Sequence, residues 1–354
     1  MHSLRMLRRA QPSRAMQWAA PVAAVALTLI FGLALFAALG IPPLRAMHAL
    51  FLEPLSNLNG WSELLLKASP LCLIALGLAI GFRSNIWNVG AEGQMYLGAI
   101  CATGLAIHFQ TSWGAALLPA MVLAGAIGGM LWASIVAFLR ARFAASEILV
   151  SLMLTYVADL MLKYLVYGPW RDPAANNFPV TVPFEDNGLF PLLFEGSRVN
   201  ASVFMTVLAV PVVWVFMTRS FAGFQLRVAG LAPNAARYAG FSAQRSIWIA
   251  LLAGGAAAGL AGVGEVAGPL GQLNDRWTPG YGFTAIIVAA LGRLHPVGIV
   301  LSALLMALLY IGGEAAQIVL QLPAAVSRVF QGLLLMALLG CEVLVNYRFT
   351  WSTR

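Results

Sequence analysis

Apolar stretches of about 20 residues follow one another along most of the chain, separated by short polar segments. That is the length an α-helix needs to cross the hydrocarbon core of a bilayer. Only 10% of the residues are charged, against roughly a quarter in soluble proteins. We therefore predict an all-α polytopic membrane protein. Its about ten transmembrane helices are expected at residues 19–39, 64–82, 95–108, 115–139, 148–166, 201–217, 247–267, 283–291, 297–320 and 329–346.

The basic residues indicate how these helices are oriented, because cytoplasmic loops carry an excess of arginine and lysine. With the N-terminus inside, fourteen of the 21 basic residues face the cytoplasm and six face the exterior. This bias predicts a basic cytoplasmic tail at 1–18, a transmembrane domain at 19–346 and a cytoplasmic C-terminal tail at 347–354. It also places the loop 219–245 in the cytoplasm and the proline-rich loop 168–200 outside.

The net charge of +8 does not indicate a nucleic-acid partner, because the arginines lie at the ends of the predicted helices. Cys72, Cys101 and Cys341 occur singly in apolar segments, so neither a disulfide nor a metal site is indicated. The first apolar segment is long enough to span the membrane and no soluble domain follows it. We therefore do not expect a cleavable signal peptide.

Catalytic motifs are missing from the sequence. The two lysines, Lys67 and Lys163, precede Ala68 and Tyr164, so no phosphate-binding loop ending in Gly-Lys-Ser/Thr is present. The four histidines have no helical ligand spacing, and no Gly-x-Ser-x-Gly occurs. We expect no ATP site, metal or other cofactor in this chain, and no enzymatic activity.

Charged residues inside the predicted helices are few. Asp159 and Lys163 lie four residues apart on one helix and are expected to neutralise each other. Glu265 and Glu342 lie near opposite ends of their helices. A proton-driven carrier would be expected to carry carboxylates deep in several helices, so this pattern indicates an energy source outside the chain.

The loop 219–245 is basic and contains no acidic residue. At its centre, residues 231–240 are predicted to form a short helix, with Pro233 in the first turn and Gly240 as its terminator. A helix of two turns is not stable alone in water, so it is expected to dock on a partner. An ordinary basic cytoplasmic loop is the alternative. The candidate docking residues are Arg227, Pro233, Asn234, Ala235, Ala236, Arg237, Ala239 and Gly240.

Two glycine-rich polar breaks interrupt the apolar pattern, at 83–94 and 268–282. The helix before the first break runs inward and the helix before the second runs outward, which indicates an inverted pseudo-repeat of helices 2–5 and 7–10. Transporters place their substrate path at such interruptions. Two ordinary loops are the alternative interpretation.

Several blocks resemble the permease subunits of the ABC importers for nucleosides and simple sugars. GFRSNIWNVGAEGQ at 81–94 is similar to their signature, and SEILVSLMLTY at 146–156 is similar to their next block, which usually begins Asn-Glu. GPWRDP at 168–173 with FPVT at 178–181 matches the external loop of the longer permease. The segment 228–240 resembles the loop that docks on the ATPase, with Ala232 where Asn is common.

The resemblance implies a type II importer in the plasma (inner) membrane. This chain would work with a second, different permease, cytoplasmic ABC ATPases that carry ATP and Mg²⁺, and an extracytoplasmic substrate-binding lipoprotein. The substrate would be a nucleoside or a related simple sugar. The external loop 168–200 would either receive the lipoprotein or seal the pore mouth.

The polar side chains of the two breaks are the candidate path residues. Amides hydrogen-bond hydroxyl groups, and aromatic rings stack on ring faces. Capping of broken helices or anchoring at the interface is the alternative role. The candidates are Trp87, Asn88, Glu92, Gln94, Gln272, Asn274 and Trp277.

Two other classes of protein remain open on the sequence. A stand-alone carrier or channel for small polar solutes would transport without a companion subunit, and a membrane-embedded enzyme would form product when purified. Neither explains the cytoplasmic helix.

Overall fold

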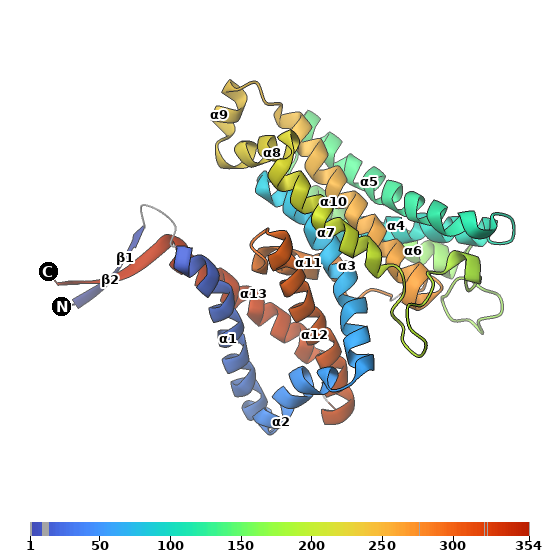
Figure 1. The fold of residues 1–354 in the computed structure, drawn as a ribbon, viewed down its shortest axis with the longest axis horizontal. Helices are drawn as coiled ribbons and strands as arrows, with labels where there is room; N and C mark the ends of the chain where they lie inside the picture. The colour runs from blue at the N-terminus through green and yellow to red at the C-terminus, as the bar shows by residue number, and fades with distance from the viewer. Residues whose placement is uncertain (1, 9–13, 276, 322, 324, 354) are drawn as a thin grey trace. The chain divides into compact units, whose positions relative to one another are not determined.

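The computed structural model describes residues 2–8, 14–275, 277–321, 323 and 325–353 (Figure 1). The helices are α1 Arg14–Ala38, α2 Pro43–Met47, α3 Leu58–Arg83, α4 Ala91–Phe109, α5 Leu117–Phe143, α6 Glu147–Tyr167, α7 Val203–Arg219, α8 Phe221–Leu231, α9 Pro233–Tyr238, α10 Ala243–Glu265, α11 Tyr281–Leu291, α12 Pro296–Leu320 and α13 Ala325–Asn346. Two strands, β1 His2–Arg8 and β2 Tyr347–Thr353, lie near the ends of the chain.

Each predicted transmembrane segment coincides with a helix of the structure. Among the described residues, six helices are long and apolar enough to cross a membrane, or seven if the bent pair α7 and α8 is one span. The chain is therefore a helical, multi-pass membrane protein. α4 begins at Ala91, inside the segment predicted as the first polar break.

Three helices begin at serines that accept a hydrogen bond from the backbone N–H three residues later. Ser146 caps α6, Ser220 caps α8 and Ser242 caps α10, with N···O distances of 3.5, 2.9 and 3.3 Å. Each cap satisfies one of the N–H groups that a helix leaves unpaired in its first turn. These serines therefore set where α6, α8 and α10 begin.

The chain divides into two compact units. The first contains the residues up to Trp61 and those from Leu308 onward. In it α1 packs on α13, and the rings of Phe36 and Phe330 stack with centroids 5.5 Å apart. β1 and β2 pair antiparallel, with His2 opposite Thr353, so residues of the two predicted tails form a small sheet. Tyr, Phe, Trp and Thr in β2 favour an extended strand.

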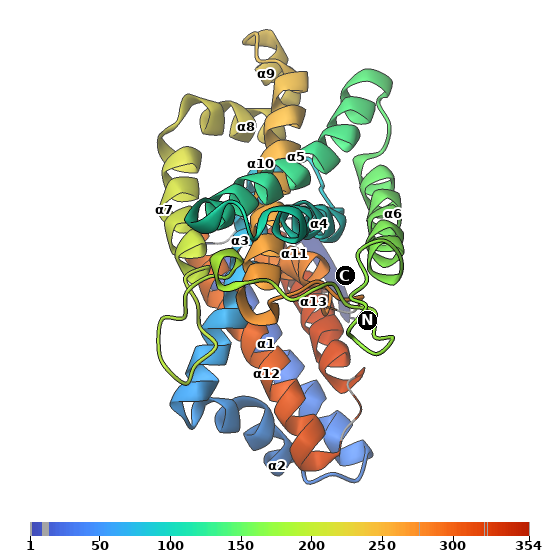
Figure 2. The ribbon, with the colours of Figure 1, turned by 90° about the vertical axis from the view of Figure 1, so that its right-hand side faces the viewer.

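The second unit, Ser62–Ala307, is organised around α4, α5 and α10, which pack side by side (Figure 2). Glycines allow their backbones to touch. A Cβ on Gly98 would lie 2.4 Å from Gly259 Cα, and one on Gly129 would lie 2.1 Å from the Gly255 carbonyl oxygen. In a membrane, where apolar surface alone does not drive helices together, such close packing holds a bundle together.

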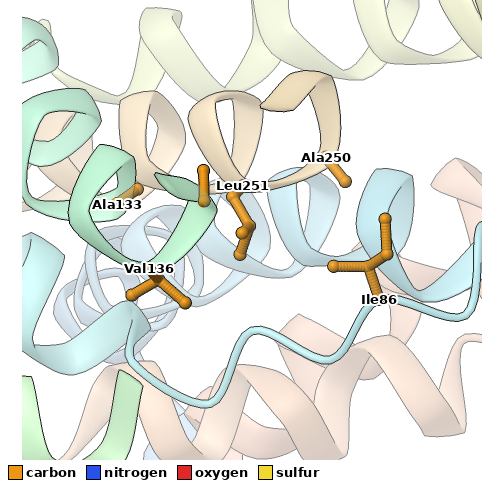
Figure 3. Packing of buried hydrophobic residues seen from close by; sticks show 6 residues of the cluster. Ile86, Ala133, Val136, Ala250 and Leu251 are labelled. Carbon is orange, nitrogen blue, oxygen red and sulfur yellow. The ribbon is translucent and has the colours of Figure 1, made fainter. Parts of the chain in front are cut away.

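Small apolar side chains continue this packing toward the first polar break. Ala133 and Val136 of α5 meet Ala250 and Leu251 of α10, and Ile86 from the break lies in the same cluster (Figure 3). All five are buried, with at most 7% of any of them exposed. The segment between α3 and α4 is therefore fixed in place by the helix core.

The two ends of the second unit carry different segments. α8 and α9 lie at the end where α10 begins, and the loop 168–200 lies at the other end of α10 (Figure 1). The basic loop and the proline-rich loop therefore lie at opposite ends of this unit.

Candidate functional site

Two residues of the first break form a closed amide pair. Asn88 Nδ2 donates to Gln94 Oε1 at 2.8 Å, and Gln94 Nε2 donates to Asn88 Oδ1 at 3.0 Å. Asn88 Oδ1 also accepts from the Gly90 N–H at 3.1 Å. Both side chains are buried, at 2% and 1% exposure. In this conformation the pair holds the break against the start of α4.

Trp87 is the exposed candidate of the same break, at 42% exposure. Its ring lies against Phe82 with centroids 4.6 Å apart, and its indole N–H donates to Asn85 Oδ1 at 3.2 Å. One face of the indole is thus held by the protein. The remaining surface is available to a neighbouring molecule.

Glu92 links the two breaks. Its Oε1 accepts from the Thr278 hydroxyl at 2.8 Å, and its Oε2 accepts from the Gly282 N–H at 2.5 Å. The Tyr96 side chain and the Phe283 backbone also hydrogen-bond to this carboxylate. The side chain is 2% exposed. Glu92 therefore acts as a buried link between segments almost two hundred residues apart in sequence.

The first turns of α4 and α11 meet at this carboxylate. A Cβ on Gly282 would lie 2.2 Å from the Glu92 backbone nitrogen, so the two helix starts are in backbone contact. The N-terminus of a helix carries partial positive charge, and a carboxylate beside it is favourable. Here one carboxylate lies at two helix N-termini. Their juxtaposition is the strongest geometric support for the predicted correspondence of the two breaks.

The second break is covered by the loop 168–200. The Thr181 N–H donates to the Leu273 carbonyl at 2.9 Å, and the Leu273 N–H donates to Thr181 Oγ1 at 3.0 Å. Asn274 forms an antiparallel bridge with Val180, and the Gln272 side chain is partly exposed beside them. This pairing satisfies backbone groups that an irregular segment would otherwise leave open.

Trp277 lies deeper in the second break. It is 6% exposed and its ring meets Tyr96 edge-on, with centroids 5.9 Å apart. Its indole N–H has no hydrogen-bond partner among the described residues. Through Tyr96 it adjoins the Glu92 network.

The structure thus joins Glu92 and Trp277 through Tyr96, and it pairs Asn88 with Gln94. Gln272 and Asn274 lie beside the loop 168–200 instead. Sequence reasoning missed Thr278 and Tyr96, which are the hydrogen-bond partners of Glu92. Tyr96 lies four residues after Glu92, a spacing that places both on one helix face and offered a signal.

The short helix predicted at the centre of the basic loop is confirmed. α9 begins at Pro233, and Gly240 takes a φ of +77° just beyond its end. The Phe241 N–H donates to the Ala236 carbonyl at 2.9 Å and the Gly240 N–H to the Arg237 carbonyl at 3.0 Å. These two bonds are the Schellman pattern that closes a helix.

Most of the candidate docking residues are exposed. Arg227, Pro233, Asn234, Ala235, Arg237, Ala239 and Gly240 all lie at the surface. Ala236 is 4% exposed and faces inward, whereas Tyr238 is 98% exposed. Tyr238 was not among the candidates and extends the exposed face of α9.

A second helix, α8, precedes α9 and was not predicted. It follows α7 at a bend of 68°. The rings of Phe221, Phe224 and Phe241 form a cluster beside it, with centroids 6.0–6.4 Å apart. The sequence signal for this helix start was Ser220, because serine is a preferred N-cap residue. Its hydroxyl oxygen accepts a hydrogen bond from the Gly223 N–H.

The predicted pair on α6 is confirmed. Lys163 Nζ lies 2.7 Å from Asp159 Oδ2, one helical turn away. A second pair closes the turn between α5 and α6, where Arg140 Nε lies 3.2 Å from Glu147 Oε2. Both pairs have a structural role.

Residues 60–339 match the family described as "branched-chain amino acid transport system / permease component". The chain belongs to this family of permeases. The permease is 36% identical to the glucose ABC transporter permease protein TsgB13 of Haloferax volcanii, over 93% of this chain and 88% of that protein. It is 30% identical to the guanosine ABC transporter permease protein NupP of Bacillus subtilis, over 82% of this chain and 84% of that protein.

The second guanosine permease of Bacillus subtilis, NupQ, is also similar. The permease is 29% identical to it, over 68% of this chain and 77% of that protein. These relatives confirm the resemblance read from the motifs: the chain is a permease subunit of an ABC importer.

Proposed function

We propose that the permease forms half of the translocation path of an importer for nucleosides or related simple sugars. The relatives named for glucose and guanosine support this range of substrates. Separate ATPase subunits, which carry ATP and Mg²⁺, drive transport. The main support for this proposal is the exposed helix α9 in the basic loop. The helix begins at Pro233 and is terminated by Gly240.

A different second permease, supported by the two guanosine permeases of one organism, completes the pore. An extracytoplasmic lipoprotein delivers the substrate. About ten helices cross the inner (plasma) membrane, with both termini in the cytoplasm, and helices 2–5 and 7–10 form an inverted pseudo-repeat. The meeting of α4 and α11 at Glu92 supports the repeat, because both helices follow a break.

For the path itself, Trp87 and Gln272 offer a ring face and an amide to the substrate, since both are accessible. Asn88, Gln94, Asn274 and Trp277 support the two breaks from within and present polar groups when the pore opens. Glu92 fixes the breaks relative to each other. The loop 168–200 seals the outer end through its pairing with 271–274.

Coupling follows from the rigidity of the α8–α9 segment. When two ATPase subunits close on ATP, each draws the α9 docked on it, and α9 moves α7 and α10, which flank the segment. Arg237, exposed on α9, would pair with a carboxylate of the ATPase. Two ordinary basic turns would not transmit such a displacement.

Reversing the charge on α9 is expected to weaken the docking of the ATPase and so to lower its substrate-stimulated activity. In the assembled complex, Ala235→Asp combined with Arg237→Glu should lower substrate-stimulated ATP hydrolysis at least tenfold, because the loss of about 1.4 kcal/mol of docking energy already weakens binding tenfold. Both side chains are exposed, so folding is unaffected. Ala236, chosen on sequence alone, is unsuitable because it is buried.

Arg245→Glu is the matched control, since Arg245 is exposed and basic but lies on α10, outside α9. It should hydrolyse ATP at the wild-type rate. Normal stimulation in the double variant would remove α9 as the docking element and would favour a stand-alone carrier or channel.

A further inference from the structure

A cavity of about 550 Å³ opens beside the cytoplasmic helices of the second unit. Three separate segments meet there: the end of α3 with the first break, the second half of α8, and the turn between α11 and α12. Its lining residues are Phe82, Arg83, Asn85, Arg227, Gly230, Leu231 and Leu294. The backbones are close, because a Cβ on Gly230 would lie 2.1 Å from the Arg83 carbonyl oxygen.

The two charged residues of this cavity are both arginines. One N–H of Arg83 donates to the Leu294 carbonyl at 2.8 Å, and one N–H of Arg227 donates to the Met217 carbonyl at 3.3 Å. A guanidinium has five N–H donors, so most donors of both groups stay available. The charge of Arg227 acts unfavourably on Arg83. In the described part of the chain, neither arginine forms an ion pair.

The surrounding sequence offers no compensating anion. The segments 82–91, 219–245 and 291–296, which build this end, contain no Asp or Glu. Arg293 and the further arginines of the loop 219–245 add to the positive potential at this end. Two positive charges that line one cavity are stabilised most simply by an anion with several acceptor oxygens. A phosphate group fits this requirement, because the planar guanidinium of arginine can donate two parallel hydrogen bonds to it.

The position of the cavity indicates where such a phosphate comes from. Arg83 ends α3, a helix long and apolar enough to span the membrane. α8 turns away from α7 by 68° and exposes Phe221 and Phe224, at 67% and 53%, on the same helix as Arg227. Helices that combine exposed aromatic residues with arginine at a membrane boundary lie in the interface and attract anionic lipids.

We propose that Arg83 and Arg227 form a binding site for the phosphate of an anionic phospholipid headgroup at the cytoplasmic face. The lipid links the end of α3 to α8, the helix that leads into α9. It therefore holds in place the segment on which coupling depends. This site does not rest on the proposed substrate or on the docking of α9.

The test is a lipid titration of the purified full-length chain in detergent, followed by native mass spectrometry. Phosphatidylglycerol and phosphatidylcholine of equal acyl chains are the probes. Wild type should retain phosphatidylglycerol preferentially, and Arg227→Gln should weaken that retention about fivefold, the effect of one basic side chain near an anionic surface. Arg237→Gln removes the same charge from α9, outside the cavity, and should retain the lipid as wild type does.

Competition by inorganic phosphate separates the two sources of a phosphate group. If phosphate displaces the lipid at millimolar concentration and binds as well as phosphatidylglycerol, the site holds, with free phosphate as its ligand. If Arg227→Gln does not fold, Arg227→Lys replaces it in the test. This variant keeps the positive charge and should retain most of the lipid.

Three results would overturn the site. One is a wild-type chain that does not distinguish the two lipids, a measurement that needs no variant. Another is equal loss in Arg227→Gln and Arg237→Gln. The third is unchanged lipid binding in Arg227→Gln together with weaker binding of the ATPase, which would assign Arg227 to a carboxylate of that subunit.

Discussion

Replacing Glu92 with alanine is expected to abolish accumulation of the folded permease. The change leaves the partly buried Thr278 hydroxyl and the buried Gly282 N–H without this acceptor, and it removes the negative charge from two helix N-termini. Hydrogen bonds to a charged group contribute about 1.5–3 kcal/mol each. The loss of several therefore approaches the 5–15 kcal/mol that typically separates folded and unfolded proteins.

Fluorescence-detected gel filtration and thermal unfolding in detergent measure this effect. Glu92→Gln keeps an acceptor oxygen but loses the charge, so it should fall between alanine and wild type. Glu195→Gln makes the same chemical change at an exposed site of the outer loop and should unfold as wild type does. If Glu92→Ala is as stable as wild type while uptake is lost, Glu92 is a path residue and its linking role is wrong.

Replacing Gly259 with valine is expected to break the helix core. Even a Cβ at this position would lie 2.1 Å from the Gly125 carbonyl oxygen and 3.2 Å from Gly129 Cα. The obstacle is backbone, so no side chain can move aside. α10 would have to separate from α5, with a loss beyond the typical 1–3 kcal/mol of an overpacked core.

The amount of monodisperse protein after extraction reports the damage. Gly332→Ala is the matched control, because a Cβ on Gly332 meets nothing within 4 Å in α13. Alanine there should be neutral or stabilising by up to about 1 kcal/mol, from its helix propensity. Wild-type yield of Gly259→Val would contradict the close approach of α5 and α10.

The long apolar helices and the short helix α9 could be predicted because their signals are local. Apolar length places the helices, and Pro233 with Gly240 marks α9 within one segment of sequence. α8 was missed because its arginine and two glycines are typical of a loop. It forms where Ser220 caps a new helix right after the bend.

The candidate site could be predicted only in part, because its geometry depends on contacts between distant segments. The two breaks were found from their polar composition. Sequence could not show that Glu92 reaches Thr278, since that contact depends on how α11 packs against α4. Nor could it distinguish Asn88, closed in an amide pair, from Trp87, which is exposed.

We propose that the permease is a passive gate driven by separate ATPase subunits, and reconstitution into sealed vesicles tests that claim most directly. Vesicles with the permease alone should take up no labelled guanosine or glucose, with or without ATP. Vesicles with the second permease, the ATPase and the binding lipoprotein should take up one of them only when ATP is hydrolysed. Uptake by the permease alone would contradict the account.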